Sequence, residues 1–222
     1  MIMDIKGVAK KFRGKQVLRD VCLTAQSGCC IGILGSNGSG KSTLLSILAG
    51  VLQRDAGSFQ CDGVELFAFP SQRERLVGYV PQGTPLLEDL TALDNLRLWY
   101  SRKELAGELE KGVLASLEIG EFLHKQVSKL SGGMKKRLSI GCAVAKRPPI
   151  LLLDEPTAAL DLKAKESIAR YLQQYKRAGG ILLLTTHDAR ELSLCDALYI
   201  LKDGVLKPFE FRGDIQELVQ RL

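Results

Sequence analysis

A glycine-rich segment that contains one lysine is the part of this chain whose residue types and spacing predict chemistry most directly. Residues 35–43 read Gly-Ser-Asn-Gly-Ser-Gly-Lys-Ser-Thr and satisfy the pattern G-x-x-x-x-G-K-S/T. Glycines allow such a segment to curl until successive N–H groups point at a phosphate chain, and the following helix presents its positive end to the same anion. The expected phosphate contacts come from Gly35, Ser36, Asn37, Gly38, Ser39, Gly40, Lys41, Ser42 and Thr43.

Two side chains of this segment have more specific expected roles. Lys41 is placed to reach the β- and γ-phosphates of ATP, and the Ser42 hydroxyl is placed to coordinate Mg²⁺. The alternative is a plain glycine turn between a strand and a helix. It is disfavoured because the apolar run before the segment and the helical pattern after it provide the context that a phosphate-binding loop requires. The segment therefore predicts binding of ATP together with Mg²⁺.

A pair of carboxylates closes a second apolar run. Residues 150–153 are Ile-Leu-Leu-Leu, and Asp154 and Glu155 follow them directly. At the carboxyl end of a strand beside the phosphate loop, Asp154 is expected to hold Mg²⁺, usually through water. Glu155 is then available to polarise the attacking water as general base. The alternative is an acidic surface turn capped by Pro156, which the phosphate loop makes less attractive.

One of the two histidines of the chain follows a third apolar run, residues 181–184, after two threonines. An imidazole at His187 can contact the γ-phosphate and orient Glu155 and the attacking water. Without these neighbours, a histidine in such a place is more often a loop or core residue. His124 is interpreted in that second way.

A second candidate anion site begins at Ser131, which is followed by Gly132 and Gly133. Ser131 is a suitable helix N-cap, and apolar residues recur from Met134 to Ala145 at a spacing of three to four residues. A helix start opened by glycines attracts anions in the same way as the phosphate loop does. One bound ATP needs only one such helix start, so the sequence leaves open where the second one points.

The elements that position these groups follow from the hydrophobic pattern. Continuous apolar runs at 29–34, 150–153 and 181–184 are typical of strands buried on both faces of a parallel sheet covered by helices. Residues after Lys41 and residues 163–177 have helical spacing, so right-handed strand–helix–strand crossovers are expected. An α/β core is therefore predicted.

The rest of the chain has a different pattern. Residues 5–23 and 58–66 alternate around turns at 13–14 and 62–63, which predicts antiparallel hairpins. Residues 92–118 are rich in Leu, Glu and Lys and are expected to be helical. We predict one domain over 1–222 with a β-rich N-terminal edge. Its expected divisions are 1–82 and 148–222 for the core with its β-subdomain and 83–147 for a helical subdomain.

Composition sets wide limits. The 222 residues are 45% hydrophobic and 25% charged, as in ordinary globular proteins, and the net charge of +6 suits a phosphate ligand, an anionic membrane or nucleic acid alike. The six cysteines form no Cys-x-x-Cys pair and are expected to be thiols in a reducing cytosol. The apolar runs are far shorter than the roughly 20 residues of a membrane helix. We therefore expect that the chain does not cross a membrane alone.

Taken in order, these motifs resemble those of the ATP-binding subunits of ABC transporters, and the resemblance extends over nearly the whole chain. Residues 35–43 resemble their Walker A motif, 150–155 their Walker B motif with Glu155 as catalytic residue, and 130–133 their signature motif. Gln82 resembles the residue of the Q-loop, Asp161 that of the D-loop and His187 the switch histidine. Phe12 stands where these proteins place an aromatic ring that stacks on adenine.

The resemblance implies a fold and a way of assembly. The fold is α/β, a P-loop NTPase (RecA-like) core with a mostly parallel sheet, an antiparallel β-subdomain at the N-terminal side and a helical insertion. Two such subunits, as a homodimer or a heterodimer, pair head to tail, so that Ser131, Gly132, Gly133 and Asp161 contact the nucleotide of the partner. Gln82 then joins Glu155 and His187 in catalysis, and it also joins Ser42 and Asp154 in binding Mg²⁺.

The resemblance also implies partners and a location. Transmembrane permease subunits are expected, and the chain would be cytoplasmic and peripheral on the inner face of the cell membrane. Nucleic acid is not expected as a partner. Met134 stands where the signature most often continues with Gln, a variant similar to drug, polysaccharide and lantibiotic-type exporter subunits, which favours export. The alternative function is a soluble ABC-type ATPase that acts on a protein assembly.

Overall fold

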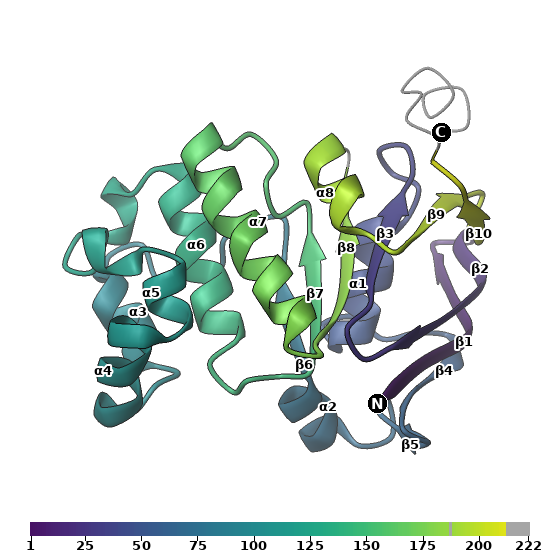
Figure 1. Ribbon diagram of the computed structural model, residues 1–222. Coiled ribbons are helices and arrows are strands. Elements are labelled where there is room, and N and C mark those ends of the chain that lie inside the picture. Colours follow the sequence, from purple (N-terminus) through teal and green to yellow (C-terminus); the bar gives the residue numbers. More distant parts are fainter. Residues whose placement is uncertain (187, 212–222) are drawn as a thin grey trace.

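Two β-sheets and a group of helices make up the fold (Figure 1). The computed structural model describes residues 1–186 and 188–211. A four-stranded sheet has the order β2-β1-β4-β5, and a six-stranded sheet has the order β10-β9-β3-β8-β7-β6. The strands of the first are β1 Ile2–Phe12, β2 Lys15–Gln26, β4 Ala56–Cys61 and β5 Val64–Glu65. Those of the second are β3 Cys30–Leu34, β6 Val77–Val80, β7 Ile150–Asp154, β8 Ile181–Thr185, β9 Ala197–Lys202 and β10 Val205–Phe209.

The centre of the six-stranded sheet is parallel and buried. β3, β7 and β8 are buried at every position, and β8 pairs in parallel with both β3 and β7. Alternate residues enter different cores: Leu152 and Leu183 pack with α1, Lys41–Ala49, whereas Leu151 and Leu182 pack with α7, Leu162–Arg177. Because both faces are covered, the strands need no polar face, which explains their continuous apolar runs. The predicted core strands are confirmed, with β3 beginning one residue later than expected.

The N-terminal sheet is antiparallel, as predicted. β1 and β2 meet at Arg13 and Gly14, and β4 and β5 meet at Asp62 and Gly63. All four turn residues have positive φ, between 45° and 84°, the conformation that suits a two-residue hairpin turn. The pairing of β1 with β4, which merges the hairpins into one sheet, was not predicted. This sheet reaches the core sheet through Arg19, whose N–H donates to the Gly204 carbonyl at 2.8 Å.

The middle of the chain is helical, as expected for residues 92–118, and it is divided into several short helices. Serine and threonine N-caps explain the divisions: Thr91 and Ser101 each form a capping box and start a new helix. The elements are α3 Ala92–Arg97, α4 Arg102–Lys111, α5 Val113–Ser116, α6 Gly132–Ala143 and the short 3₁₀ turns η1 Ile119–Phe122 and η2 Val127–Lys129. Outside this group lie α2 Pro70–Leu76 and α8 Ala189–Leu194. The helix expected to continue to Ala145 ends at Ala143.

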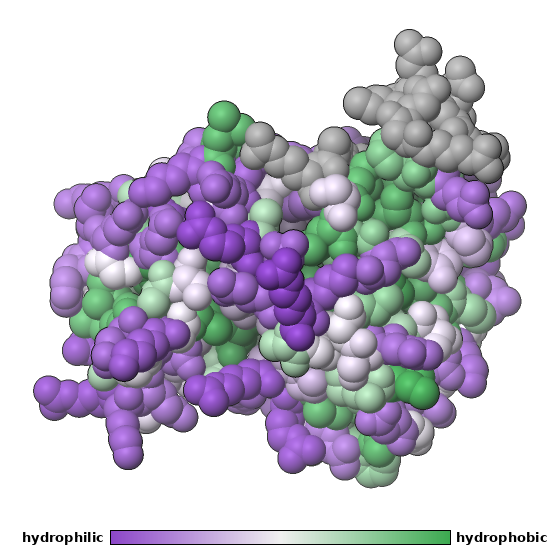
Figure 2. All heavy atoms as spheres, viewed as in Figure 1, coloured by the Kyte–Doolittle hydropathy of each residue, from purple (hydrophilic) through white to green (hydrophobic). Residues whose placement is uncertain are grey.

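The helical group lies to one side of the core sheet, and α7 crosses the front of it (Figure 1). Figure 2 shows hydrophilic side chains over the outer side of α7, whose Ile168 and Leu172 are buried. The boundaries 1–82, 83–147 and 148–222 stay a prediction, and residues 212–222 of the last range lie outside the described residues. Within the described part of the chain, no helix is long and apolar enough to span a bilayer.

The six cysteines are all free thiols. In the part of the chain that the structure describes, no group of three or more His, Cys, Asp or Glu side chains could hold a metal ion.

Candidate active site

The phosphate loop connects the end of β3 to the start of α1. Its backbone requires glycine at particular positions. Gly35 has a φ of +157°, and a Cβ there would lie 2.6 Å from Ser39 Oγ and 2.7 Å from the Leu201 carbonyl. Gly40 is the N-cap of α1 with a φ of +108°, and its Cβ would press on Val17. The loop therefore keeps its curl because side chains are excluded from its tightest points.

Lys41 is folded into the loop. Its side chain is 6% exposed, and Nζ donates to the carbonyls of Gly35 at 2.6 Å and Ser36 at 3.1 Å. Burial lowers the pKa of Lys41, against the opposing influence of Glu155 and Asp154. An ammonium group has three N–H donors, so two bonds to carbonyls leave one donor for a phosphate oxygen. Lys41 thus stabilises the conformation of the loop and also supplies its positive charge.

A cavity of about 460 Å³ lies beside the phosphate loop. It is lined from both sheets: by Lys15, Gln16, Val17 and Arg19 of β2, by Ser36–Ser39 of the loop, and by Lys202, Asp203 and Gly204 between β9 and β10. Three of these residues are cationic, which suits a polyphosphate. The cavity thus lies where the two sheets meet, and we call this junction the seam.

Phe12 is close to this cavity in the hairpin but does not line it. The residue ends β1, pairs with Lys15 of β2 and is 41% exposed. Lys10 Nζ lies 5.4 Å from the centre of its ring. An exposed aromatic ring at the edge of the seam is compatible with a base stacked on it. The adenine contact stays a prediction.

The two carboxylates occupy the carboxyl end of β7, as the sequence predicts. Asp154 is 2% exposed, and its Oδ1 accepts a hydrogen bond from Thr185 Oγ1 at 2.7 Å. The same hydroxyl accepts from the Glu155 N–H at 3.0 Å. Thr185 is missing from the predicted site. It could have been found from the pairing of the strands, because Thr185 follows the apolar run of β8 and pairs with Asp154 in the parallel sheet.

The Glu155 side chain is hydrogen-bonded to the side chain of Gln82. Gln82 follows β6 by two residues, and its Nε2 donates to Glu155 Oε2 at 3.1 Å. Because β6 pairs in parallel with β7, the residues that follow the two strands meet at the same sheet edge. Glu155 has a φ of +47°, a left-handed conformation that costs a non-glycine residue roughly 1–2 kcal/mol. The backbone therefore fixes the direction of this side chain at some energetic cost.

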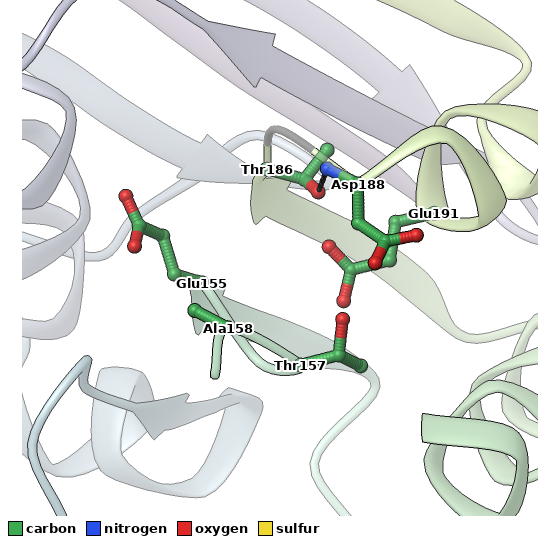
Figure 3. Close-up of a pocket in the computed structure, with 6 residues that line it drawn as sticks. All are labelled: Glu155, Thr157, Ala158, Thr186, Asp188 and Glu191. Atoms are coloured by element: carbon green, nitrogen blue, oxygen red, sulfur yellow. Dashed lines mark hydrogen bonds between the residues drawn. The ribbon is translucent and has the colours of Figure 1, made fainter. Parts of the chain in front are cut away.

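A small pocket of about 210 Å³ lies beside Glu155 (Figure 3). It is lined by Glu155, Thr157, Ala158, Thr186, Asp188 and Glu191. Figure 3 shows the Glu191 carboxyl pointing toward the Thr157 side chain, whereas the Glu155 carboxyl points away from both. Glu191 is 4% exposed, and burial raises its pKa, against the opposing influence of Thr186 and Thr157. His187 falls between Thr186 and Asp188 and lies outside the described residues.

Glu191 was missed from the sequence because nothing in the sequence separates it from an ordinary surface carboxylate of α8. Asp188 is held by Lys165 of α7 at 2.6 Å. The pocket therefore joins residues after β7, after β8 and from α8, and an ion pair ties it to α7.

The signature residues form a separate group. Ser131 caps α6, with its Oγ accepting from the Met134 N–H at 3.3 Å, as predicted. Asp161 caps α7, with its Oδ1 accepting from the Ala164 N–H at 2.9 Å. A Cβ on Gly133 would lie 2.6 Å from Ala164 Cβ, so the two helix starts pack closely. Ser131 and Gly132 are exposed, and neither is among the described residues that line the cavity beside the phosphate loop.

Comparisons with known proteins identify the family of this chain. The family model described as ABC transporter matches residues 18–158, which is more than half of the chain. This chain belongs to the ABC transporter family. It is the ATP-binding subunit of an ABC transporter, and it is an ATPase.

Relatives and solved structures agree with this family. The Nod factor export ATP-binding protein I of Burkholderia lata is 35% identical over 91% of this chain and 68% of its own length. The lipopolysaccharide export system ATP-binding protein LptB of Escherichia coli is 33% identical over 92% of this chain and 88% of its own length. A solved dimeric, post-hydrolysis ATP-binding cassette bound to ADP and Pi has a TM-score of 0.82 at 29% identity, covering 96% of this chain and 100% of the other. The α/β fold of an ABC ATPase is therefore confirmed.

Proposed function

We propose that this ABC ATPase hydrolyses ATP at sites that two subunits share, and that the cycle drives transport through separate transmembrane permease subunits. The observation that carries the proposal is the division of the site. Lys41, Asp154 and the Gln82–Glu155 pair belong to one group, whereas the exposed Ser131 and Gly132 belong to another. A second copy turned head to tail would place the second group over the first.

Each group has a distinct part in the proposed reaction. The loop N–H groups and Lys41 bind and orient the phosphates. Glu155 takes a proton from the attacking water, and Gln82 holds the Glu155 carboxylate in position through the 3.1 Å contact. In this proposal His187 contacts the γ-phosphate. Together these groups fix the water and the phosphate in a line suited to displacement.

Mg²⁺ fits the donors that the chain offers. Asp154, Ser42 and Gln82 supply a carboxylate, a hydroxyl and an amide carbonyl, all of them oxygen donors of the kind that Mg²⁺ prefers. Mg²⁺ usually takes one or two carboxylates and fills its remaining positions with phosphate oxygens and water. This agrees with a site that has only one ligating carboxylate. The ion would neutralise charge on the phosphates.

Ser131→Arg is expected to abolish ATP-dependent dimerisation and to leave ATP binding by the monomer within about two-fold of normal. A long cation at an exposed helix start would fill the space that the partner's nucleotide needs, and it removes a cap that contributes about 1 kcal/mol. Light scattering with ATP, in the background of a hydrolysis-deficient variant, measures the dimer. A fluorescent-ATP titration measures binding.

Ser101→Arg is the matched control, because Ser101 also caps a helix and is exposed. It should lose similar stability and still dimerise. Loss of monomer binding in Ser131→Arg would argue that the signature residues serve their own nucleotide, which contradicts the shared site.

An exposed apolar segment supports a membrane partner. Four of the described chain's exposed large apolar side chains fall within residues 87–99: Leu87, Leu90, Leu98 and Trp99. This segment follows Gln82 and enters the helical group through α3. Exposed apolar residues gathered in one segment mark interaction sites. A permease segment docked here would lie close in the chain to the residue that contacts Glu155.

Trp99→Ser is expected to weaken the complex with the permease subunits that we propose as partners. Large aromatic side chains at the centre of an interface often contribute about 2 kcal/mol or more, so the Kd should rise roughly 30-fold. ATP hydrolysis by the isolated chain should stay unchanged. Val51→Ser is the control, because Val51 is more exposed and lies outside the segment. Equal weakening by both substitutions would count against this docking surface.

The names of two relatives support a direction of transport. The Burkholderia and Escherichia proteins are described as export ATP-binding proteins. By this likeness we propose export, with the chain on the cytoplasmic face of the membrane, bound to its permease subunits. The second ATPase of the dimer is either a second copy of this chain or a related chain, because the exposed Ser131 and Gly132 can face the nucleotide of either.

A further inference from the structure

A lysine buried in the signature helix connects that helix to the Gln82 loop. Lys136 lies in α6, five positions after Ser131, and is 4% exposed. Its Nζ donates to the carbonyls of Pro81 and Gln82, at 2.9 Å in each case. Lysine is almost never this buried unless its charge is paired or hydrogen-bonded. Two backbone carbonyls of one loop are therefore the reason this side chain can be inside.

The charge of Lys136 also lies near the catalytic carboxylates. Burial lowers the pKa of Lys136, while Asp154, Glu155 and Glu191 act in the opposite direction. A hydrogen bond from an ammonium group to a carbonyl is stronger than one between neutral groups. The Gln82 loop is thus held by two strong contacts from a helix far away in the sequence.

These contacts continue to the general base. Gln82 is bound by Lys136 through its carbonyl and binds Glu155 through its side chain at 3.1 Å. At the other end of the same stretch of α6, Ser131 caps the helix. Five helical residues span about 7.5 Å and move as one piece. A shift of the start of α6 at Ser131 would therefore be passed through Lys136 to the loop that positions Glu155.

We propose that Lys136 is a positioning residue that joins the signature helix to Gln82, so that nucleotide contact at Ser131 in one shared site adjusts Glu155 in the other. The inference rests on the proposed function, in which Ser131 contacts the nucleotide of the partner subunit. Nucleotide binding in one ATPase site then alters the position of Glu155 in the other site. Two ATP sites coupled in this way hydrolyse cooperatively.

Lys135 provides a matched control. It is the neighbouring lysine on the same helix, and its Nζ pairs with Glu88 at 2.7 Å. The Lys135 side chain is 20% exposed and that of Glu88 is 61% exposed, so water screens this ion pair at its Glu88 end and the pair contributes little to stability. Lys135→Met and Lys136→Met remove the same groups from adjacent positions, and only the second removes the contacts to the Gln82 loop.

The experiment measures steady-state ATP hydrolysis by the full chain, with ATP and Mg²⁺, for both variants and for Lys136→Gln. Lys136→Met should lower kcat by about 10- to 100-fold, because displacement of a catalytic group by even 1 Å has effects of this size. KM and fluorescent-ATP binding should change less than about three-fold, because Lys41 and its loop are intact. The Hill coefficient for ATP should fall toward one.

Lys136→Gln should recover part of the kcat, because its amide keeps two N–H donors on a shorter side chain. Lys135→Met should match the unaltered chain in all three quantities. Thermal melting of each variant separates a positioning role from general loss of fold. If Lys136→Met melts too low to assay, the Lys136→Gln variant carries the test through its Hill coefficient.

Equal kcat and Hill coefficient for Lys136→Met and Lys135→Met would overturn the inference. So would equal losses of kcat and ATP binding in Lys136→Met with a normal melting temperature, because that result places the lysine in nucleotide binding. The proposed function is tested separately by substitution of Glu155. If that substitution abolishes hydrolysis while Lys136→Met does not alter it, only the role of Lys136 is rejected.

Discussion

Glu155→Gln is expected to lower kcat for ATP hydrolysis by about 10²- to 10⁴-fold, the contribution typical of a general base. Gln has nearly the same shape as Glu but cannot take a proton from water. The contact with Gln82 Nε2 can persist through the amide oxygen, so the site keeps its geometry. ATP affinity should stay within about three-fold, because the phosphate loop is unchanged. Phosphate-release kinetics and a fluorescent-ATP titration measure the two effects.

The same variant should accumulate a dimer in ATP, because ATP bound between the subunits is no longer consumed. Light scattering with and without ATP detects it. Glu166→Gln is the control: Glu166 is on α7, its side chain is 73% exposed, and its ion pair is with Arg170 at 3.7 Å. It should hydrolyse ATP at the normal rate. Unchanged turnover in Glu155→Gln would remove Glu155 as the base and the proposed mechanism with it.

Lys41→Ala is expected to raise the Kd for ATP by roughly 30- to 150-fold, since hydrogen bonds to charged groups are worth about 2–3 kcal/mol. The substitution removes the cation from the phosphates. It also leaves the carbonyls of Gly35 and Ser36 without their buried donor. Both effects weaken the loop as a phosphate site, and a fluorescent-ATP titration measures them together.

Thermal melting separates loss of the ligand site from loss of the fold in Lys41→Ala. Lys103→Ala, on the exposed surface of α4, removes the same groups and should bind ATP normally. An unchanged Kd in a folded Lys41→Ala variant would show that the nucleotide phosphates are held elsewhere.

The parts of the site that sequence could predict are those whose pattern is local. The phosphate loop needs nine consecutive residues, 35–43, and Asp154 and Glu155 need only the apolar run before them. Hairpin turns at 13–14 and 62–63 and the cap at Ser131 are equally local, and the structure confirms them. In each case neighbours in the chain decide the conformation, so a single sequence contains enough information.

The parts that could not be predicted depend on contacts between distant residues. Thr185 contacts Asp154 because two parallel strands share a register, and Lys136 reaches the Gln82 loop across more than 50 positions of sequence. In the sequence, Lys136 cannot be distinguished from its neighbour Lys135, and both would be expected at the surface. β6 was not predicted because four residues with a central glycine form too short a pattern. Tertiary packing decides these features.

The cavity beside the phosphate loop has a consequence for the cohesion of the chain. Its walls come from the antiparallel sheet through Arg19 and from the core sheet through Gly204, which also share a backbone hydrogen bond of 2.8 Å. A nucleotide bound there would hold the two sheets together, because its phosphates would attract basic side chains from both of them. At 100 times its Kd, a ligand that binds only the folded state adds about 2.7 kcal/mol of stability. ATP would then stabilise the folded chain as well as being its substrate. Without bound nucleotide, the contact between the two sheets would be less stable.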